Sequence, residues 1–158
     1  MNIGAQHAAG DYLLFLHGDT SLPDDLGELT TILDMEEYAW GRFDMRLSGQ
    51  AWVFRMIESC MNLRSRISGV ATGDQAIFVH RKLFEKVGAY PEIALMEDVA
   101  MSKKLRKVMP PICLRSCVMS SSRRWEQHGI IKMIVKMWLF RLLYFFGYDT
   151  QKLARHYR

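Results

Sequence analysis

The chain has 158 residues, a length that fits one domain with a sizeable core. Hydrophobic residues make up 49% and charged residues 24% of the sequence, a globular balance that excludes an intrinsically disordered protein. The formal net charge of +4 does not by itself call for nucleic acid, so we expect no nucleic-acid partner. The three cysteines, Cys60, Cys113 and Cys117, are too few for a disulfide scaffold, which favours the cytoplasm.

Hydrophobic periodicity and turn residues divide the chain into short elements. In chain order they predict a helix over 2–9, a strand over 12–16, a helix over about 24–35, a strand over 38–45, a helix over about 50–67, a strand over 75–80, helices over 81–87 and 97–108, a strand over 112–119, a long helix over about 124–146 and a short helix over 149–158. The apolar run at 12–16 is typical of a strand buried on both faces of a parallel sheet. The alternation as a whole predicts an α/β fold.

Two groups of carboxylates are candidate functional residues. Asp19 follows the strand at 12–16, where open α/β sheets bind ligands, and it could hold a divalent cation shared with substrate phosphates. His17 could be a second ligand, a donor to phosphate or a loop residue, while Asp19 could equally form a turn or cap a helix. Glu97 and Asp98 open a helix, where they either stabilise its N-terminus or supply a general base.

A third candidate is the sequence Arg123-Arg124-Trp125, which follows three serines. A pair of guanidinium groups suits a diphosphate, because each can donate two parallel hydrogen bonds to it. The indole can pack over a sugar ring. The alternative is a basic surface beside a buried tryptophan, and the residues alone leave both interpretations open.

Four motifs, in this order, resemble glycosyltransferase family two, whose members have the GT-A fold. They are AAGDYLLFLHGDTSLP, TGDQAIFVHRKLFEKVGAYPE, LMEDVAMSKKLRK and SSRRWE, and together they cover nearly the whole chain. The chain looks closest to the bacterial subgroup described as radical SAM/selenodomain-associated glycosyltransferases. The resemblance implies a Rossmann-like mixed sheet flanked by helices, with a long C-terminal helix. It also implies the metal-dependent, inverting transfer of a glycosyl group from a nucleotide-diphospho sugar to a hydroxyl acceptor.

The resemblance implies a role for each matching residue. The family's Asp-X-Asp motif falls on 17–19, so Asp19 matches the carboxylate that binds manganese or magnesium, and His17 replaces the first aspartate. Asp98 matches the base that deprotonates the acceptor, with Glu97 beside it. The residues assigned to substrate binding are Gly73, Asp74, Gln75, Arg123, Arg124 and Trp125. Ser121 stands where processive synthases have the glutamine of a Gln-X-X-Arg-Trp motif, so processive synthesis is not inferred.

The first two strands of the family, which hold the base and ribose, have no counterpart in this sequence. We therefore predict a partial catalytic domain over 1–122, in which the strand at 12–16 lacks neighbours on one side, and a helical extension over 123–158. An unpaired apolar edge promotes association, so we expect a homo-oligomer or completion by another chain. The alternative function is a truncated or split-gene remnant without catalysis.

The segment 129–146 is apolar apart from three cations, Lys132, Lys136 and Arg141. Each cation would cost on the order of 2.5–3.5 kcal/mol at the centre of a bilayer, so a spanning helix is disfavoured. One alternative is a helix lying in the membrane interface, which would place the protein at the inner face of the membrane. The other is a helix that packs against a partner subunit.

Overall fold

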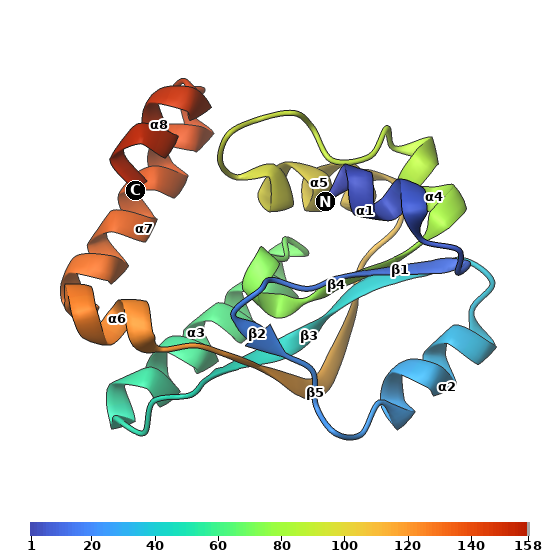
Figure 1. Cartoon of the computed structure of the whole chain (residues 1–158), viewed down its shortest axis with the longest axis horizontal. Coiled ribbons are helices and arrows are strands. Elements are labelled where there is room, and N and C mark those ends of the chain that lie inside the picture. The colour runs from blue at the N-terminus through green and yellow to red at the C-terminus, as the bar shows by residue number, and fades with distance from the viewer. Residues whose placement is uncertain (158) are drawn as a thin grey trace.

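Within residues 1–157, which the computed structural model describes, five strands form a mixed sheet with helices on both sides (Figure 1). In chain order the elements are α1 (Asn2–His7), β1 (Tyr12–Phe15), β2 (Thr20–Ser21), α2 (Gly27–Met35), β3 (Trp40–Leu47), α3 (Trp52–Ser68), the 3-10 turn η1 (Gly73–Gln75), β4 (Ile77–His80), α4 (Arg81–Lys86), α5 (Glu97–Val108), β5 (Ile112–Ser120), α6 (Arg123–His128), α7 (Ile130–Phe145) and α8 (Thr150–Tyr157). The predicted α/β fold, a mixed sheet flanked by helices with a helical C-terminal segment, is confirmed.

The predicted boundaries of most elements lie within three residues of those observed. The predicted strand over 75–80 begins at Ile77, because the residues before it form η1. The helix predicted to begin at about residue 24 begins at Gly27, and its N-cap, Leu26, makes no side-chain hydrogen bond. Asp25 accepts a hydrogen bond from the Gly27 backbone N–H at 2.7 Å. The two-residue strand β2 was not predicted, because two residues are too few to show a hydrophobic period.

β1 lies at one edge of the sheet, whose strand order is β1-β4-β3-β5-β2. It pairs antiparallel with β4, so that Tyr12 lies opposite His80. Its side chains alternate, with Leu13 4% and Leu14 37% exposed. The prediction of a strand buried on both faces of a parallel sheet is therefore wrong, because an apolar run indicates a strand but does not specify its partner. Within residues 1–157, the other edge of β1 has no strand beside it, as expected.

β3 lies in the centre of the sheet, antiparallel to β4 and parallel to β5. A Cβ at Gly41 of β3 would come within 2.1 Å of the Ile112 backbone oxygen and 2.5 Å of the Phe78 ring, so this close approach requires glycine. At the far end of β5, the Ser121 backbone N–H donates to the Asp19 backbone oxygen at 3.0 Å. The sheet thereby brings the loop after β1 next to the segment that enters α6.

Each face of the sheet packs against its own hydrophobic core. On one face, α1, α4 and α5 cover side chains from β1, β3 and β4, among them Phe15, Trp40 and Val79. On the other face, α2 and α3 cover side chains from β3 and β5, among them Phe43 and Val118. The result is a three-layer arrangement in which the sheet is enclosed and its strand ends are held in place (Figure 1).

The predicted long helix over 124–146 is in fact two helices, because Gly129 adopts a φ of 83° between α6 and α7. Glycine takes up such a conformation readily, and it ends a helix. Trp125 of α6 and Met133 of α7 belong to the core that α2 and α3 cover, so the extension packs on the main body. Leu153 of α8 is also buried. None of the helices within residues 1–157 has the length and hydropathy needed to cross a bilayer.

Candidate functional site

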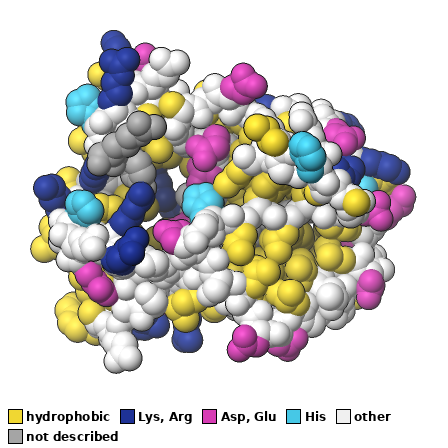
Figure 2. Space-filling model, viewed as in Figure 1, with side chains coloured by type: hydrophobic (Ala, Val, Ile, Leu, Met, Phe, Trp, Pro, Cys, Tyr) yellow, Lys and Arg dark blue, Asp and Glu magenta, His cyan; other side chains and the backbone are white. Residues whose placement is uncertain are grey.

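A cavity of about 390 Å³ lies between strand ends of the sheet and the helices α6 and α7. Figure 2 shows the molecule hollowed at this place. The residues that line it come from six segments: His17 and Asp19 after β1; Thr72, Gly73 and Asp74 at η1; Ala94, Leu95, Met96, Glu97 and Asp98 at the start of α5; Ser120 and Ser121 at the end of β5; Arg124 and Trp125 in α6; and Met133, Met137, Phe140 and Arg141 in α7. The cavity therefore joins residues from both ends of the chain.

Most of the residues singled out from the sequence lie around this cavity. Those that line it are His17, Asp19, Gly73, Asp74, Glu97, Asp98, Arg124 and Trp125. Gln75 and Arg123 do not line it. Asp19 and Arg124 meet there, although 105 positions separate them, because β2 pairs antiparallel with the end of β5 and α6 follows directly. This pairing, which the sequence did not reveal, is what assembles the site.

Buried hydrogen bonds hold the loop that leads into η1. The Ala71 backbone N–H donates to Ser102 Oγ at 3.2 Å, and the Ser102 hydroxyl donates to the Ala71 backbone oxygen at 3.0 Å. The Gln75 side chain is fully buried. Its amide nitrogen donates to Ser65 Oγ at 3.0 Å, and its oxygen accepts from the Thr72 backbone N–H at 3.3 Å. Gln75 thus anchors the loop instead of facing the cavity.

Gly73 is the point of closest packing in the cavity wall. A Cβ at this position would come within 2.2 Å of His17 Nε2, so the imidazole lies directly against the glycine backbone. The Gly73 backbone N–H donates to Asp98 Oδ2 at 2.7 Å. The glycine therefore connects two candidate residues, His17 and Asp98, that are 81 positions apart in the sequence.

Asp98 is half-buried at the start of α5. Burial raises the pKa of its carboxyl group, and the negative charges of Glu97 and Asp74 raise this pKa further. Hydrogen bonds from the backbone N–H groups of Gly73 and Val99, both at 2.7 Å, oppose the shift. A carboxyl group whose pKa is raised toward neutrality in a cavity is typical of a general base or acid.

Met96 precedes the Glu97-Asp98 pair in a left-handed backbone conformation, with φ 67° and ψ 22°. For a residue with a Cβ this conformation costs about 1–2 kcal/mol. Strain of this kind persists where the surroundings hold it, and it concentrates at functional sites. Nothing in the sequence pattern signals it, because methionine has no preference for positive φ.

Two arginines that the sequence analysis did not assign contribute charge to the site. Arg141 lines the cavity, and Arg64 of α3 lies close enough to interact with Arg141 and with the carboxylates of Asp74 and Asp98. Burial lowers the pKa of Arg64 to about 10, and the charge of Arg141 also lowers it, whereas the two carboxylates raise it. Within residues 1–157, Arg64 Nη2 and Asp74 Oδ1 are buried without a hydrogen-bond partner.

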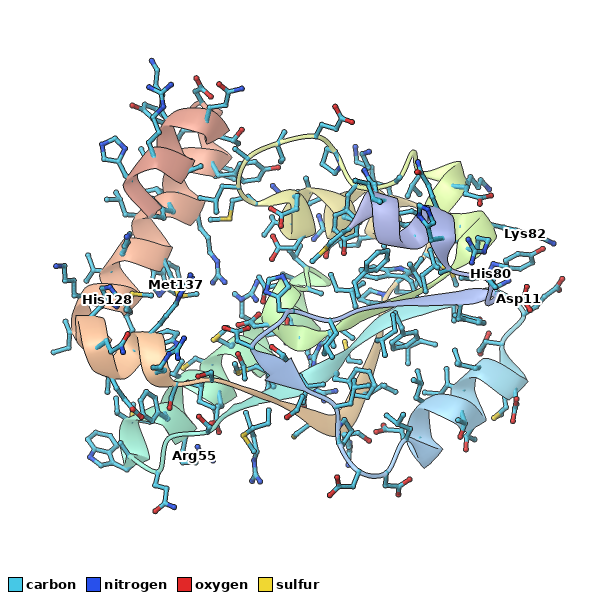
Figure 3. The ribbon with its side chains drawn as sticks, viewed as in Figure 1. Asp11, Arg55, His80, Lys82, His128 and Met137 are labelled. Atoms are coloured by element: carbon cyan, nitrogen blue, oxygen red, sulfur yellow. The ribbon has the colours of Figure 1, made fainter. Side chains whose placement is uncertain are left out.

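We use the name polar wall for the part of the lining formed by His17, Asp19, Gly73, Asp74 and Asp98, and helical wall for the part formed by Trp125, Met133, Met137 and Phe140. The side chain of Met137, labelled in Figure 3, projects from α7 toward the rest of the molecule. The apolar sequence of α7 predicts a membrane or subunit surface, but it does not by itself indicate that one face of the helix lines a cavity. The spacing of 133, 137 and 140, which places them on one helix face, was the available signal.

Asp19 and His17 are the ligand-type side chains predicted to bind a cation. Within residues 1–157, no group of three or more His, Cys, Asp and Glu side chains is arranged to hold a metal ion. Magnesium sites that serve phosphate chemistry, however, use one or two carboxylates and take further ligands from the substrate phosphates and water. The exposed carboxylate of Asp19 at the cavity fits a cation shared with a phosphate-bearing ligand, and not an all-protein metal site.

With this geometry established, the chain can be compared with known proteins. Comparisons with protein-family models, with curated proteins and with solved structures find no match.

Proposed function

We propose that this chain is the catalytic part of an inverting glycosyltransferase of GT-A type, which moves a glycosyl group from a nucleotide-diphospho sugar to a hydroxyl acceptor. The observation that carries the proposal is that residues from four motifs line one cavity: His17 and Asp19, residues 72–74, residues 97–98 and residues 124–125. These are the motifs on which the resemblance to glycosyltransferase family two rests.

Asp98 is proposed to act as the general base. As the acceptor oxygen bonds to the anomeric carbon, the bond from that carbon to the diphosphate breaks, and the hydroxyl proton passes to the Asp98 carboxylate. The raised pKa of Asp98 makes it a stronger base than an ordinary aspartate. Glu97 supports this role, because its negative charge contributes to the raised pKa.

The diphosphate is proposed to lie against Arg124 and Arg141, which both line the cavity. Guanidinium groups form charge-assisted hydrogen bonds with phosphate oxygens. Asp19, with His17 nearby in the sequence, would hold manganese or magnesium in the same cavity. When bound, such a cation acts as a Lewis acid that stabilises the departing diphosphate.

The compartment proposed is the cytoplasm. Cys60, Cys113 and Cys117 are all free thiols, and thiols persist where the surroundings are reducing. Nucleotide sugar and hydroxyl acceptor are the partners proposed for the cavity.

A transfer assay tests the proposal directly. The full chain is incubated with high concentrations of uridine and guanosine diphospho-sugars, because the strands expected to hold the base and ribose have no counterpart in this sequence. Manganese or magnesium and a panel of hydroxyl acceptors are added, and the release of nucleoside diphosphate is measured. We expect release that requires the cation and is abolished in Asp19→Ala. The matched control is Asp11→Ala, since Asp11 is an exposed aspartate before β1 that does not line the cavity (Figure 3). Wild-type release by Asp19→Ala in chelator-treated buffer would contradict the assignment.

A second candidate function is that of a subunit that is completed by another copy or by a different chain. The edge of β1 favours it, because Leu14 and Leu16 are 37% and 39% exposed beside the unpaired edge. Figure 2 shows a broad hydrophobic patch on this side of the molecule. Light scattering at tens of micromolar separates the alternatives: an oligomer is expected, and a stable monomer would count against completion by a second copy.

A further inference from the structure

α7 has a second apolar face, directed away from the cavity. The side chains of this face, which we call the outer stripe, are Ile131, Val135, Trp138, Leu139, Leu142, Phe145 and Phe146, and they are 48–79% exposed. The opposite face carries Met133 and Phe140, which are buried. A helix that is apolar on all sides is normally covered by protein or by lipid. Within residues 1–157, the side chains of the outer stripe are far more exposed to solvent than Met133 and Phe140, which are 9% and 6% exposed.

Cations border the outer stripe on both sides. At 3.6 residues per turn, Lys132 lies about 100° from Ile131 around the helix in one direction, and Arg141 lies about 80° from it in the other. Lys136 lies on the same side as Lys132, with its ammonium group 5.6 Å from the centroid of the Phe140 ring. An apolar stripe bordered by lysines is the pattern of a helix that lies in the plane of a membrane interface.

Positive charge is concentrated in the extension to which α7 belongs. Residues 123–158 contain eight Lys and Arg and two Asp and Glu, which gives a net charge of +6. Since the whole chain has a net charge of +4, residues 1–122 carry −2. Figure 2 shows Lys and Arg side chains gathered over α6 to α8. An anionic surface is therefore attracted to this end of the molecule and not to the other.

A second copy of the chain fits the outer stripe less well. In a two-fold symmetric contact the same patch faces itself, so Lys132 and Lys136 would lie near the partner copy's identical cations. α7 contains no aspartate or glutamate that could compensate for this repulsion. A bilayer with anionic headgroups, in contrast, pairs the cations and covers the apolar side chains at the same time.

α3 offers an internal comparison. It also has exposed apolar side chains, among them Trp52 and Ile67 at 74% and 79% exposure. Two of its arginines, however, form ion pairs within the protein: Arg55 Nη2 lies 2.8 Å from Glu58, and Arg66 Nη2 lies 2.6 Å from Asp44. Both helices thus expose apolar side chains, but ion pairs with Glu58 and Asp44 offset the charge of two arginines on α3, while α7 contains no aspartate or glutamate.

We propose that the outer stripe of α7 docks on a bilayer surface that contains anionic phospholipids. The helix lies parallel to the membrane, the apolar side chains enter the acyl boundary, and Lys132 and Lys136 lie at the headgroups, while Arg141 stays at the cavity that it lines. The proposal does not depend on the catalytic one. It places the cavity, whose helical wall is the inner face of the same helix, directly behind the membrane-bound surface.

Vesicle sedimentation with the full chain tests the proposal. We expect binding to vesicles of phosphatidylcholine and phosphatidylglycerol at low salt, weaker binding at high salt, and little binding to phosphatidylcholine alone. Lys132→Gln with Lys136→Gln should weaken binding roughly 25-fold, at about fivefold for each cation near the surface. Ile131→Ser with Trp138→Ser should abolish it.

Ile67→Ser with Trp52→Ser on α3 is the matched control, because it replaces the same residue types at similar exposure. This variant should bind as the wild type does. Tryptophan fluorescence supplies an independent readout: the blue shift on vesicle binding should disappear in Trp138→Phe and persist in Trp52→Phe.

Several outcomes would overturn the proposal. The wild type could stay in the supernatant with anionic vesicles at low salt, or the α3 control could lose as much binding as the α7 variant. Alternatively, the outer-stripe variant could abolish self-association in light scattering while vesicle binding persists, which would make the stripe an interface between copies. Circular dichroism checks that each variant folds. If the variant of the outer stripe does not fold, the vesicle binding of the Lys132→Gln, Lys136→Gln variant tests the proposal instead.

Discussion

The polar wall and the helical wall of the cavity are held in place by different interactions. Hydrogen bonds fix the polar wall: Gly73 donates to Asp98 at 2.7 Å, and the adjoining loop is tied to Ser102. The helical wall is held by apolar packing and is joined to α6 through Gly129. Its methionines are flexible and adapt to ligands of different shape. The difference suggests that the polar wall positions reacting groups, while the helical wall provides an adaptable apolar contact for substrate.

The largest effect should come from the polar wall, with Asp98→Asn. Loss of a positioned general base lowers a rate by about 10²–10⁴-fold, whereas the amide keeps the shape and can still accept from the Gly73 N–H. We expect such a loss in the turnover number with little change in donor affinity. Glu97→Gln, which changes the neighbouring side chain, should have a smaller effect. A loss confined to donor affinity would assign Asp98 a structural role.

A smaller loss of rate is expected for Gly73→Ala. The new Cβ would meet the tip of the His17 ring, which can swing away, so the free energy of unfolding should change by less than about 1 kcal/mol. The displaced groups should nevertheless lower the rate, on the order of 10²-fold for a shift of about 1 Å. Turnover and thermal unfolding are measured on the same sample.

Gly4→Ala is the control for the Gly73 variant. Gly4 lies in α1, and no atom lies within 4 Å of the position that its Cβ would take. Alanine in a helix should stabilise the protein by up to about 1 kcal/mol and leave turnover unchanged. Full activity of Gly73→Ala would show that the polar wall is less rigid than its contacts indicate.

The helical wall should respond to Met137→Ala through substrate affinity. Removing most of an apolar side chain from a contact loses about 1–2 kcal/mol, or roughly tenfold in the Michaelis constant for an acceptor with an apolar group. The turnover number should not change. Met56→Ala is the control, since Met56 is an exposed methionine on α3. A fall in turnover without a change in the Michaelis constant would remove the distinction between the walls.

The smallest effect concerns stability as a function of pH. Because the pKa of Asp98 is raised in the folded state, the folded chain retains a proton that the unfolded chain loses as the pH rises. The Asp98 carboxyl group therefore lowers the free energy of unfolding more and more as the pH rises from the ordinary pKa of aspartate to the raised pKa of Asp98. Above the raised pKa this loss of stability is constant. Thermal unfolding should show that Asp98→Asn gains stability over the wild type as the pH rises through this window. An advantage that shrinks with rising pH would contradict the raised pKa.

Local sequence determined the elements and most of the candidate residues. Apolar runs and turn residues predicted α5 and β5 almost to the residue, because helix and strand periods depend on near neighbours. Asp19 and Asp98, both predicted as site residues, line the cavity. The sequence predicted them because each lies at the end of a strand or the start of a helix, and this position depends on neighbouring residues alone. Gln75 belonged to a matching motif, yet its side chain turned inward, which no pattern of neighbours specifies.

Only the tertiary structure decided which elements meet. The antiparallel pairing of β1 with β4 and of β2 with β5 depends on contacts between residues 60 to 100 positions apart, and an apolar run does not encode its partner. The break at Gly129 turns α7 back so that Met137 and Arg141 reach the cavity. A single glycine in an apolar segment is compatible with a continuous helix, so the sequence alone does not predict the break. Glycine adopts a φ of 83° at little cost, and the buried contacts of Met133 and Phe140 decide that it does so here.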